Sequence, residues 1–151
     1  MKRSLYAVLV LGLALVGCSV FAQPDTPAND RPLVTVVGTQ ISVQPNPLRF
    51  ERGRGNVHIN WRLPQGAKHR FAENGIVIDG EVDDPSAREL KPGARLKAQS
   101  EVVECRRTAN GLQFSCLNKN SRPGVYKYTV RLVDEKGVAL PPHDPSIVNM
   151  Q

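Results

Sequence analysis

Two cysteines placed symmetrically about an Asn-Gly dipeptide constrain the fold more than any other feature of this sequence. Asn110-Gly111 is a strong short-range signal for a β-hairpin, because both residues tolerate the positive φ angles of a two-residue turn. Cys105 lies five residues before the dipeptide and Cys116 lies five residues after it, which predicts that the cysteines are direct cross-strand partners. Opposed Cα atoms lie about 4.5–5.5 Å apart, within the range that a disulfide accepts.

A disulfide is therefore the preferred state of these cysteines, and a pair of reduced, buried thiols is the alternative. A zinc site is disfavoured, because ten residues separate the cysteines and no His lies nearby. The pair would fall at a hydrogen-bonded position, where a bridge is strained, so we expect a bulge or a slipped turn to adjust it. The cysteines should share a face with Val103, Leu112 and Phe114, opposite Gln113 and Ser115.

The rest of the chain has the pattern of short β-strands separated by turns. Alternation of apolar and polar residues with a period of two predicts half-buried strands over residues 57–63 and 126–132. Shorter strands are predicted over residues 33–37, 40–43, 47–50 and 76–78. The turns between strands are predicted at Gly38, 44–47, 53–55, Asn74-Gly75 and Lys136-Gly137. This spacing predicts an all-β chain folded as an immunoglobulin-like β-sandwich.

The sequence after the signal and the tether contains one helical signal, near residues 84–91. Asp84 is suited to cap a helix, Pro85 is suited to its first position, and Pro92 would end it. These residues predict one short helix within the all-β chain. We interpret Asp83-Asp84 as a turn and cap, in preference to an acid pair or a metal site.

The first 22 residues have the pattern of an export signal. Two basic residues precede an uncharged apolar run over residues 5–16, which has the length of a signal-peptide core and is too short to span a bilayer. Residues 23–32 are rich in Pro, Asp and Asn, which predicts an extended tether. Residues 33–150 are then predicted to form a single domain of ordinary size.

This signal offers two cleavage sites. Leu15-Val16-Gly17-Cys18 resembles the bacterial lipobox, in which the cysteine receives a diacylglycerol and becomes the new N-terminus. By this resemblance, Ser19 after the cysteine implies an outer-membrane lipoprotein that faces the periplasm or the cell surface. The alternative is cleavage after Ala22, which would release a soluble periplasmic or secreted protein. Either route leads through an oxidising compartment and favours the predicted disulfide.

Two further resemblances concern the end of the chain. The run GVYKYTVRLVDEKG at residues 124–137 resembles the late strand of bacterial immunoglobulin-like domains. Residues 144–149 resemble the closing D-P-x-I strand of small exported bacterial proteins. Both resemblances imply architecture and carry no activity.

A looser resemblance links the chain to cupredoxins. Residues 47–53 (P-x-x-F-x-x-G), a following strand, His69 and the aromatic run at 124–128 form the outline. The copper-binding cysteine of that family would fall at Val130, so a blue-copper site would lack its thiolate. His69, His143 and Met150 are the residues that could supply other ligands, but we expect neither copper nor any other cofactor.

No catalytic constellation is visible in the sequence. The motifs G-x-S-x-G, H-E-x-x-H and the P-loop do not occur, and His58 lies on the polar face of its predicted strand, where we expect it to be solvated. We therefore expect a non-catalytic binding or interaction module of the cell envelope, with a protein or glycan partner and no nucleic acid. The alternative is a structural or inhibitor-like lipoprotein that binds an anionic glycan or lipopolysaccharide.

Four arginines are candidates for contact with such a polyanion: Arg49, Arg52, Arg54 and Arg62, which are expected around one hairpin. The formal net charge is +6, and it falls to +4 when Lys2 and Arg3 leave with the signal. A positive charge of this size favours anionic surfaces only modestly. Glu51 interrupts the cluster, so ordinary solvated turn and strand faces are the competing interpretation.

Overall fold

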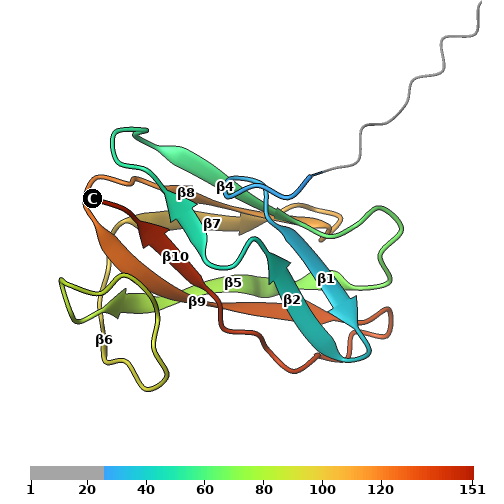
Figure 1. The fold of residues 1–151 in the computed structure, drawn as a ribbon. Coiled ribbons are helices and arrows are strands. Elements are labelled where there is room, and N and C mark those ends of the chain that lie inside the picture. Colours follow the sequence, from blue (N-terminus) through green and yellow to red (C-terminus); the bar gives the residue numbers. More distant parts are fainter. Residues whose placement is uncertain (1–25) are drawn as a thin grey trace, which may run out of the picture.

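The computed structural model describes residues 26–151, which form two packed five-stranded sheets (Figure 1). The strands of the first sheet are β1 (Leu33–Val37), β2 (Gln40–Gln44), β4 (Val57–Arg62), β7 (Val102–Arg107) and β8 (Gln113–Asn118). Those of the second sheet are β3 (Leu48–Phe50), β5 (Arg70–Val82), β6 (Leu96–Lys97), β9 (Gly124–Val133) and β10 (Ser146–Asn149). Cys18, Ala22 and the first residues of the predicted tether lie outside the described residues.

The order of the strands is that of an immunoglobulin-like sandwich. The first sheet has the order β2-β1-β4-β8-β7 and the second has the order β3-β10-β9-β5-β6. Strands β4, β8 and β7 thus occupy the places of strands B, E and D, and β5, β9 and β10 occupy those of C, F and G. The predicted all-β, immunoglobulin-like fold class is confirmed. No helix among residues 26–151 is long and apolar enough to cross a membrane.

The core between the sheets follows the predicted alternation of β4 and β9. Trp61 on β4 and Tyr128 on β9 are fully buried, and their ring centroids lie 5.3 Å apart. The Trp61 indole N–H donates a hydrogen bond of 3.2 Å to the Tyr128 hydroxyl, which joins the two sheets at their centre. Burial raises the pKa of the Tyr128 hydroxyl well above its usual value, so this donor and acceptor pair stays neutral.

The cysteine hairpin has the predicted register, and its disulfide is confirmed. Arg106 pairs with Ser115, and Cys105 is bonded to Cys116. The register shifts between Val103 and Arg106, and this shift is the expected bulge. Glu104 lies within the bulge and has a positive φ of 53°. The turn is wider than predicted, because the Thr108 N–H bonds to the Gln113 carbonyl and closes a longer loop.

The predicted turn at Asn74-Gly75 is wrong. Strand β5 runs through these residues from Arg70 to Val82, and its pairing with β9 shifts register between Phe71 and Ile76. A Cβ at Gly75 would lie 2.8 Å from Phe71 Cβ, so the bulge relies on a residue without a side chain. An Asn-Gly dipeptide permits a turn, but here pairing with β9 on both sides of the dipeptide places it in a bulge within one long strand.

The helix predicted near residues 84–91 is absent, and a turn at residues 85–86 and a bend at 88–89 occupy this range. The Asp84 carboxylate accepts hydrogen bonds from the backbone N–H and the hydroxyl of Ser86. This is the contact that a helix cap makes, so the local capping signal is present, but the chain does not continue as a helix beyond it. Ala87 and Leu90 then pack on the second sheet, as described below.

Part of the predicted tether belongs to the folded domain. The Asp30 and Pro32 carbonyls accept hydrogen bonds from β4, at 2.8 Å from Asn60 N and 3.1 Å from Arg62 N. The Asn29 side chain accepts a hydrogen bond of 2.9 Å from the Arg49 N–H on β3. The folded domain therefore begins at about residue 28 and not at residue 33.

Candidate functional site

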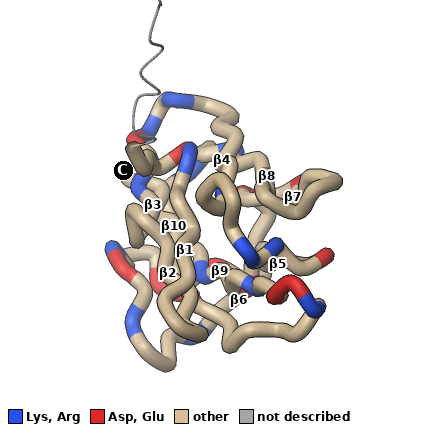
Figure 2. Tube along the Cα trace, turned by 90° about the vertical axis from the view of Figure 1, so that its right-hand side faces the viewer, with Lys and Arg blue, Asp and Glu red and all other residues tan. Residues whose placement is uncertain are grey.

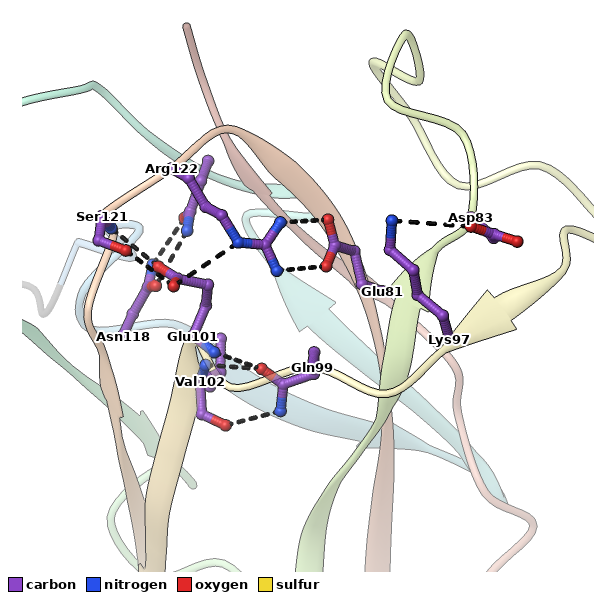
Figure 3. Close-up of polar contacts among 10 residues, drawn as sticks. Glu81, Asp83, Lys97, Gln99, Glu101, Val102, Asn118, Ser121 and Arg122 are labelled. Atoms are coloured by element: carbon purple, nitrogen blue, oxygen red, sulfur yellow. Dashed lines mark hydrogen bonds and ion pairs between the residues drawn. The ribbon is translucent and has the colours of Figure 1, made fainter.

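Polar side chains, and not apolar ones, fill one end of the sandwich. Five buried polar residues gather there from both sheets and the connections between them: Glu81, Glu101, Asn118, Asn120 and Asn149. Figure 3 shows this polar end, with Arg122 pointing toward the two glutamates. Buried polar groups are costly unless they are paired, so each of these residues requires partners inside the protein.

Arg122 joins the two glutamates. Its Nη1 and Nη2 donate two parallel hydrogen bonds to the Glu81 carboxylate, at 2.6 and 2.5 Å. Its Nε lies 3.9 Å from Glu101 Oε1. Glu101 also accepts hydrogen bonds of 2.8 Å from the N–H and the hydroxyl of Ser121. Glu81 lies on β5 and Glu101 directly precedes β7, so Arg122 links elements of both sheets.

The electrostatics of the polar end favour the charged form of the Glu81 carboxylate. The hydrogen bonds from Arg122 hold the pKa of the Glu81 carboxyl below its usual value, and they outweigh the opposing effect of burial. Burial raises the pKa of Tyr126, the neighbouring phenol, to about 12. Gly124 makes room for these groups, because a Cβ there would lie 2.5 Å from the Tyr126 hydroxyl and 3.1 Å from Glu81 Oε1.

Three asparagines complete the polar end. The Asn118 and Asn149 amides exchange hydrogen bonds of 2.7 and 3.1 Å between β8 and β10. Asn120 donates from its amide to the Glu51 carbonyl at 2.7 Å, which attaches the loop after β3. Because Glu81 and Glu101 are 5% and 4% exposed, a ligand cannot reach their carboxylates. We interpret the polar end as a structural hydrogen-bond and ion-pair network that holds the two sheets together.

The outer face of the second sheet carries a different feature, the long connection between β5 and β6. We call this connection, residues 83–95, the outer loop; it lies at the lower left of Figure 1. Val82, Val125 and Val148 point away from the first sheet and form a second apolar cluster. Side chains of the outer loop and of neighbouring residues cover this cluster: Ala87, Leu90, Ala94, Leu96 and Met150.

Pockets open around the outer loop. One of about 410 Å³ lies against Val82 and is lined mainly by loop residues, among them Asp84, Arg88 and Arg95. A second of about 560 Å³ lies between the loop and the outward side chains of Lys127 and Asp144. Both pockets have apolar floors and charged rims of both signs. A hollow of this kind can accept a polar partner with small apolar groups.

The sheet beside the second pocket is held by an ionic network. The Lys127 ammonium lies 3.0 Å from both Asp79 and Asp144. The Thr129 hydroxyl is within hydrogen-bond distance of the same two carboxylates, at 2.8 and 2.9 Å. These contacts join β5, β9 and the segment before β10 at the side of the second pocket.

The structure separates the four arginines predicted to contact a polyanion. β3 and β4 belong to different sheets, so they form no hairpin, and Arg62 lies at the far end of β4. Arg49, Arg52 and Arg54 stay together on β3 and the loop that follows, where all three are exposed. These three make no ion pair within residues 26–151. Figure 2 shows that other Lys and Arg residues are spread along the trace among Asp and Glu.

The residues of the cupredoxin outline do not converge. His69 precedes β5 near the Val133 end of β9, whereas Met150 follows β10 near the Gly124 end. Val130 is fully buried in the core, and its backbone pairs with that of His143. Among residues 26–151, no group of three or more His, Cys, Asp or Glu side chains is placed to hold a metal ion.

Sequence analysis missed both the polar end and the outer loop. Glu81 and Arg122 are 41 residues apart in the chain, and no local pattern links them. The outer loop carried a signal in its length and in its Pro and Gly content, but these residues favoured a helix equally well. In comparisons with known proteins, no protein-family model matches this chain and no curated protein sequence is similar to it.

Proposed function

We propose that this protein is an exported, non-catalytic binding module of the cell envelope, and that the outer loop forms its ligand-binding face. The observation that carries the proposal is the pair of pockets along the outer loop. Connections of this length that lack secondary structure are uncommon in compact domains and usually serve a function. A rigid sandwich that presents such a loop is a common arrangement of binding proteins.

The chemistry of the outer loop favours a protein or glycan partner. Its exposed rim carries charges of both signs, with Asp84, Arg88, Glu89 and Arg95 among them. Charges of both signs provide directional hydrogen bonds and ion pairs, whereas a purely basic rim would favour any polyanion. The apolar floor adds contacts for methyl groups or sugar rings.

A second candidate function uses the β3 edge of the same sheet, where Arg49 also lines pockets shared with outer-loop residues such as Arg88 and Glu89. Arg49, Arg52 and Arg54 form a basic edge next to Asn29, close to the point where the chain enters the domain. This placement supports the alternative role of an envelope lipoprotein that contacts an anionic glycan or lipopolysaccharide. If Cys18 is anchored in a membrane, the basic edge lies on the side of the domain that is attached to the anchor.

The lipid anchor has its own test. The mature chain is expected to begin at a diacylglyceryl-modified Cys18, and mass spectrometry of the protein from the envelope fraction measures this directly. The Cys18→Ala protein should lack the lipid mass and leave the membrane fraction. A native N-terminus at Gln23 would contradict the anchor and support the soluble form.

A pull-down from envelope extract tests the two faces. The double variant Glu89→Lys, Lys91→Glu exchanges two charges of the outer loop and keeps the net charge. The specific partner should then be lost. We expect at least a tenfold drop in its recovery, which corresponds to about 1.4 kcal/mol of binding free energy. Glu135→Lys with Lys136→Glu is the matched control at the other end of β9, and its partner should remain. Equal recovery with both exchanges would contradict the binding face.

The same experiment includes the basic edge. Arg49 is kept, because it lines pockets with the outer loop. Replacing Arg52 and Arg54 by Ser should leave the protein partner bound, but it should greatly reduce co-purification of lipopolysaccharide if the second function holds. Lys68 and Arg106 are exposed basic residues elsewhere, and their joint replacement by Ser removes the same charge. Loss of lipopolysaccharide in both double variants would indicate a general charge effect and no site at the basic edge.

A further inference from the structure

We propose that β2 is a self-association edge through which two copies of this chain join their first sheets into one continuous sheet. Three observations carry this inference: the unused backbone groups of β2, the protection of every other sheet edge, and the internal symmetry of the β2 sequence. It does not depend on the outer loop or on the state of Cys18.

The backbone groups of Ile41 and Val43 point to the free edge of β2. The turn at Gly38-Thr39 places Val37 opposite Gln40, and residues that flank a two-residue turn form a hydrogen-bonded pair. Pairs alternate along an antiparallel ladder, so Ile41 and Val43 occupy the positions that do not bond to β1. Within residues 26–151 their N–H and C=O groups have no other backbone partner.

The other three sheet edges are protected. β6 is only two residues long, and the Arg49 N–H on the edge of β3 is already bonded to the Asn29 side chain. β7 is interrupted by the bulge between Val103 and Arg106 and carries charged side chains. These are the devices by which natural sheets block further pairing. β2 has none of them, since its five residues pair with β1 in unbroken register and include no charge, Pro or Gly.

The sequence of β2 is symmetric about its centre. It reads Gln-Ile-Ser-Val-Gln, so an antiparallel copy centred on Ser42 sets Ile41 opposite Val43 and Gln40 opposite Gln44. In this register Ile41 and Val43 of each copy meet as hydrogen-bonded pairs, which gives four backbone hydrogen bonds across the edge. The apolar side chains stay on the core side of both sandwiches, where they are already buried. A two-fold axis at Ser42 thus satisfies both the hydrogen bonds and the side-chain pattern.

The two-fold axis has a consequence for the attachment of the chain. Leu33 pairs with Gln44, so the chain enters each domain at the Gln44 end of β2. An antiparallel partner is reversed, and the two entry points lie at opposite ends of the joined sheet.

Charged substitutions at Ser42 test the pairing of two β2 strands. Ser42 lies on the outward face of β2 and meets its own copy across the two-fold axis. In a Cys18→Ser background, Ser42→Lys and Ser42→Glu should each raise the dimer dissociation constant about fivefold or more, because like charges then face each other. An equimolar mixture of the two variants should dimerise at least as well as the parent protein. Sedimentation velocity over a range of concentrations measures the dissociation constants of the two variants and of their mixture.

Thr35 provides the matched control. It lies beside Ser42 on the same face, one strand further from the edge, so Thr35→Lys should leave self-association unchanged. In the same background, Ser42→Cys should form a disulfide-linked dimer on oxidation, since opposed Cα atoms of such a pair lie about 4.5 Å apart. The Thr35→Cys sites would lie about 14 Å apart, three strand spacings, and should not crosslink.

Clear results would overturn the proposal. A parent protein that stays monomeric at every concentration would do so, and so would Ser42→Cys crosslinking no better than Thr35→Cys. A dimer that the Ser42 variants leave unchanged would show that another surface associates. Capture of a different protein by Ser42→Cys, without self-crosslinking, would assign the edge to another partner and contradict self-pairing. Circular dichroism checks that each variant keeps its fold.

Discussion

Replacing Arg122 with Ala is expected to lower the free energy of unfolding by about 2–3 kcal/mol at pH 7. This is a large effect for an arginine whose side chain is partly exposed to solvent. The reason is the pair of carboxylates that it serves, because Glu81 and Glu101 are almost completely buried. Breaking a buried pair by removing one partner typically costs about 3–5 kcal/mol. We expect less here, since the Arg122 side chain is 44% exposed and water screens part of the interaction.

The dependence on pH distinguishes this ionic effect from lost packing. The pKa of Glu81 is lowered in the folded protein, so its contribution to stability is complete above the pKa of the unfolded chain. That contribution is lost as the pH falls through the lower folded value. Without Arg122, burial, which raises the pKa of Glu81, outweighs the attraction of Lys97, which lowers it, so the variant gains stability when Glu81 is protonated. The difference between the two proteins should therefore narrow below about pH 4.

Chemical denaturation at pH 7 and at pH 3.5 measures both effects. Arg95→Ala is the control, because Arg95 is an exposed arginine of the outer loop and should change stability little. Adding Glu81→Gln to Arg122→Ala should restore part of the loss, since the uncompensated charge disappears. An Arg122→Ala protein as stable as Arg95→Ala, or a loss that does not depend on pH, would contradict the interpretation of the polar end.

Replacing Cys105 with Ser is expected to lower the free energy of unfolding by about 3 kcal/mol or somewhat less. The disulfide closes a loop between residues 11 apart, and its removal frees that loop in the unfolded chain. Cys105 is exposed on β7 and Cys116 is fully buried, so this choice keeps the buried sulfur in place and avoids a cavity. The melting temperature should fall by roughly 10 °C.

Reduction provides the control for this prediction. The parent protein in a strong reductant should melt close to the Cys105→Ser protein, and the reductant should change the variant itself only slightly. Differential scanning calorimetry with and without reductant gives the melting temperatures of the parent and of the variant in both states. If the variant melts with the oxidised parent, the bridge contributes nothing to stability and the edge strand β7 is held by its ladder alone.

Local sequence determined several of the strands and the cysteine hairpin. β1 begins and ends at the predicted residues, because the turn at Gly38 and the alternation of Leu33–Val37 are both encoded within a few positions. β4 and β9 bury the predicted faces, since a period of two assigns each side chain to one side of a sheet. The disulfide followed from the position of one dipeptide between two cysteines. These features depend on neighbours in the chain, so the sequence alone was sufficient.

Tertiary structure decided the rest, because the deciding contacts join residues far apart in the chain. Asn74-Gly75 became a bulge, since pairing with β9 outweighs a local preference for a turn. The proposed helix near residue 84 gave way to turns that cover Val82, Val125 and Val148, three residues on three different strands. Arg49 and Arg62 were assigned to one hairpin, but the cross-over from the second sheet to the first separates them. The polar end likewise exists only where Glu81, Glu101 and Arg122 meet, because burial makes their pairing necessary and sequence periodicity carries no information about it.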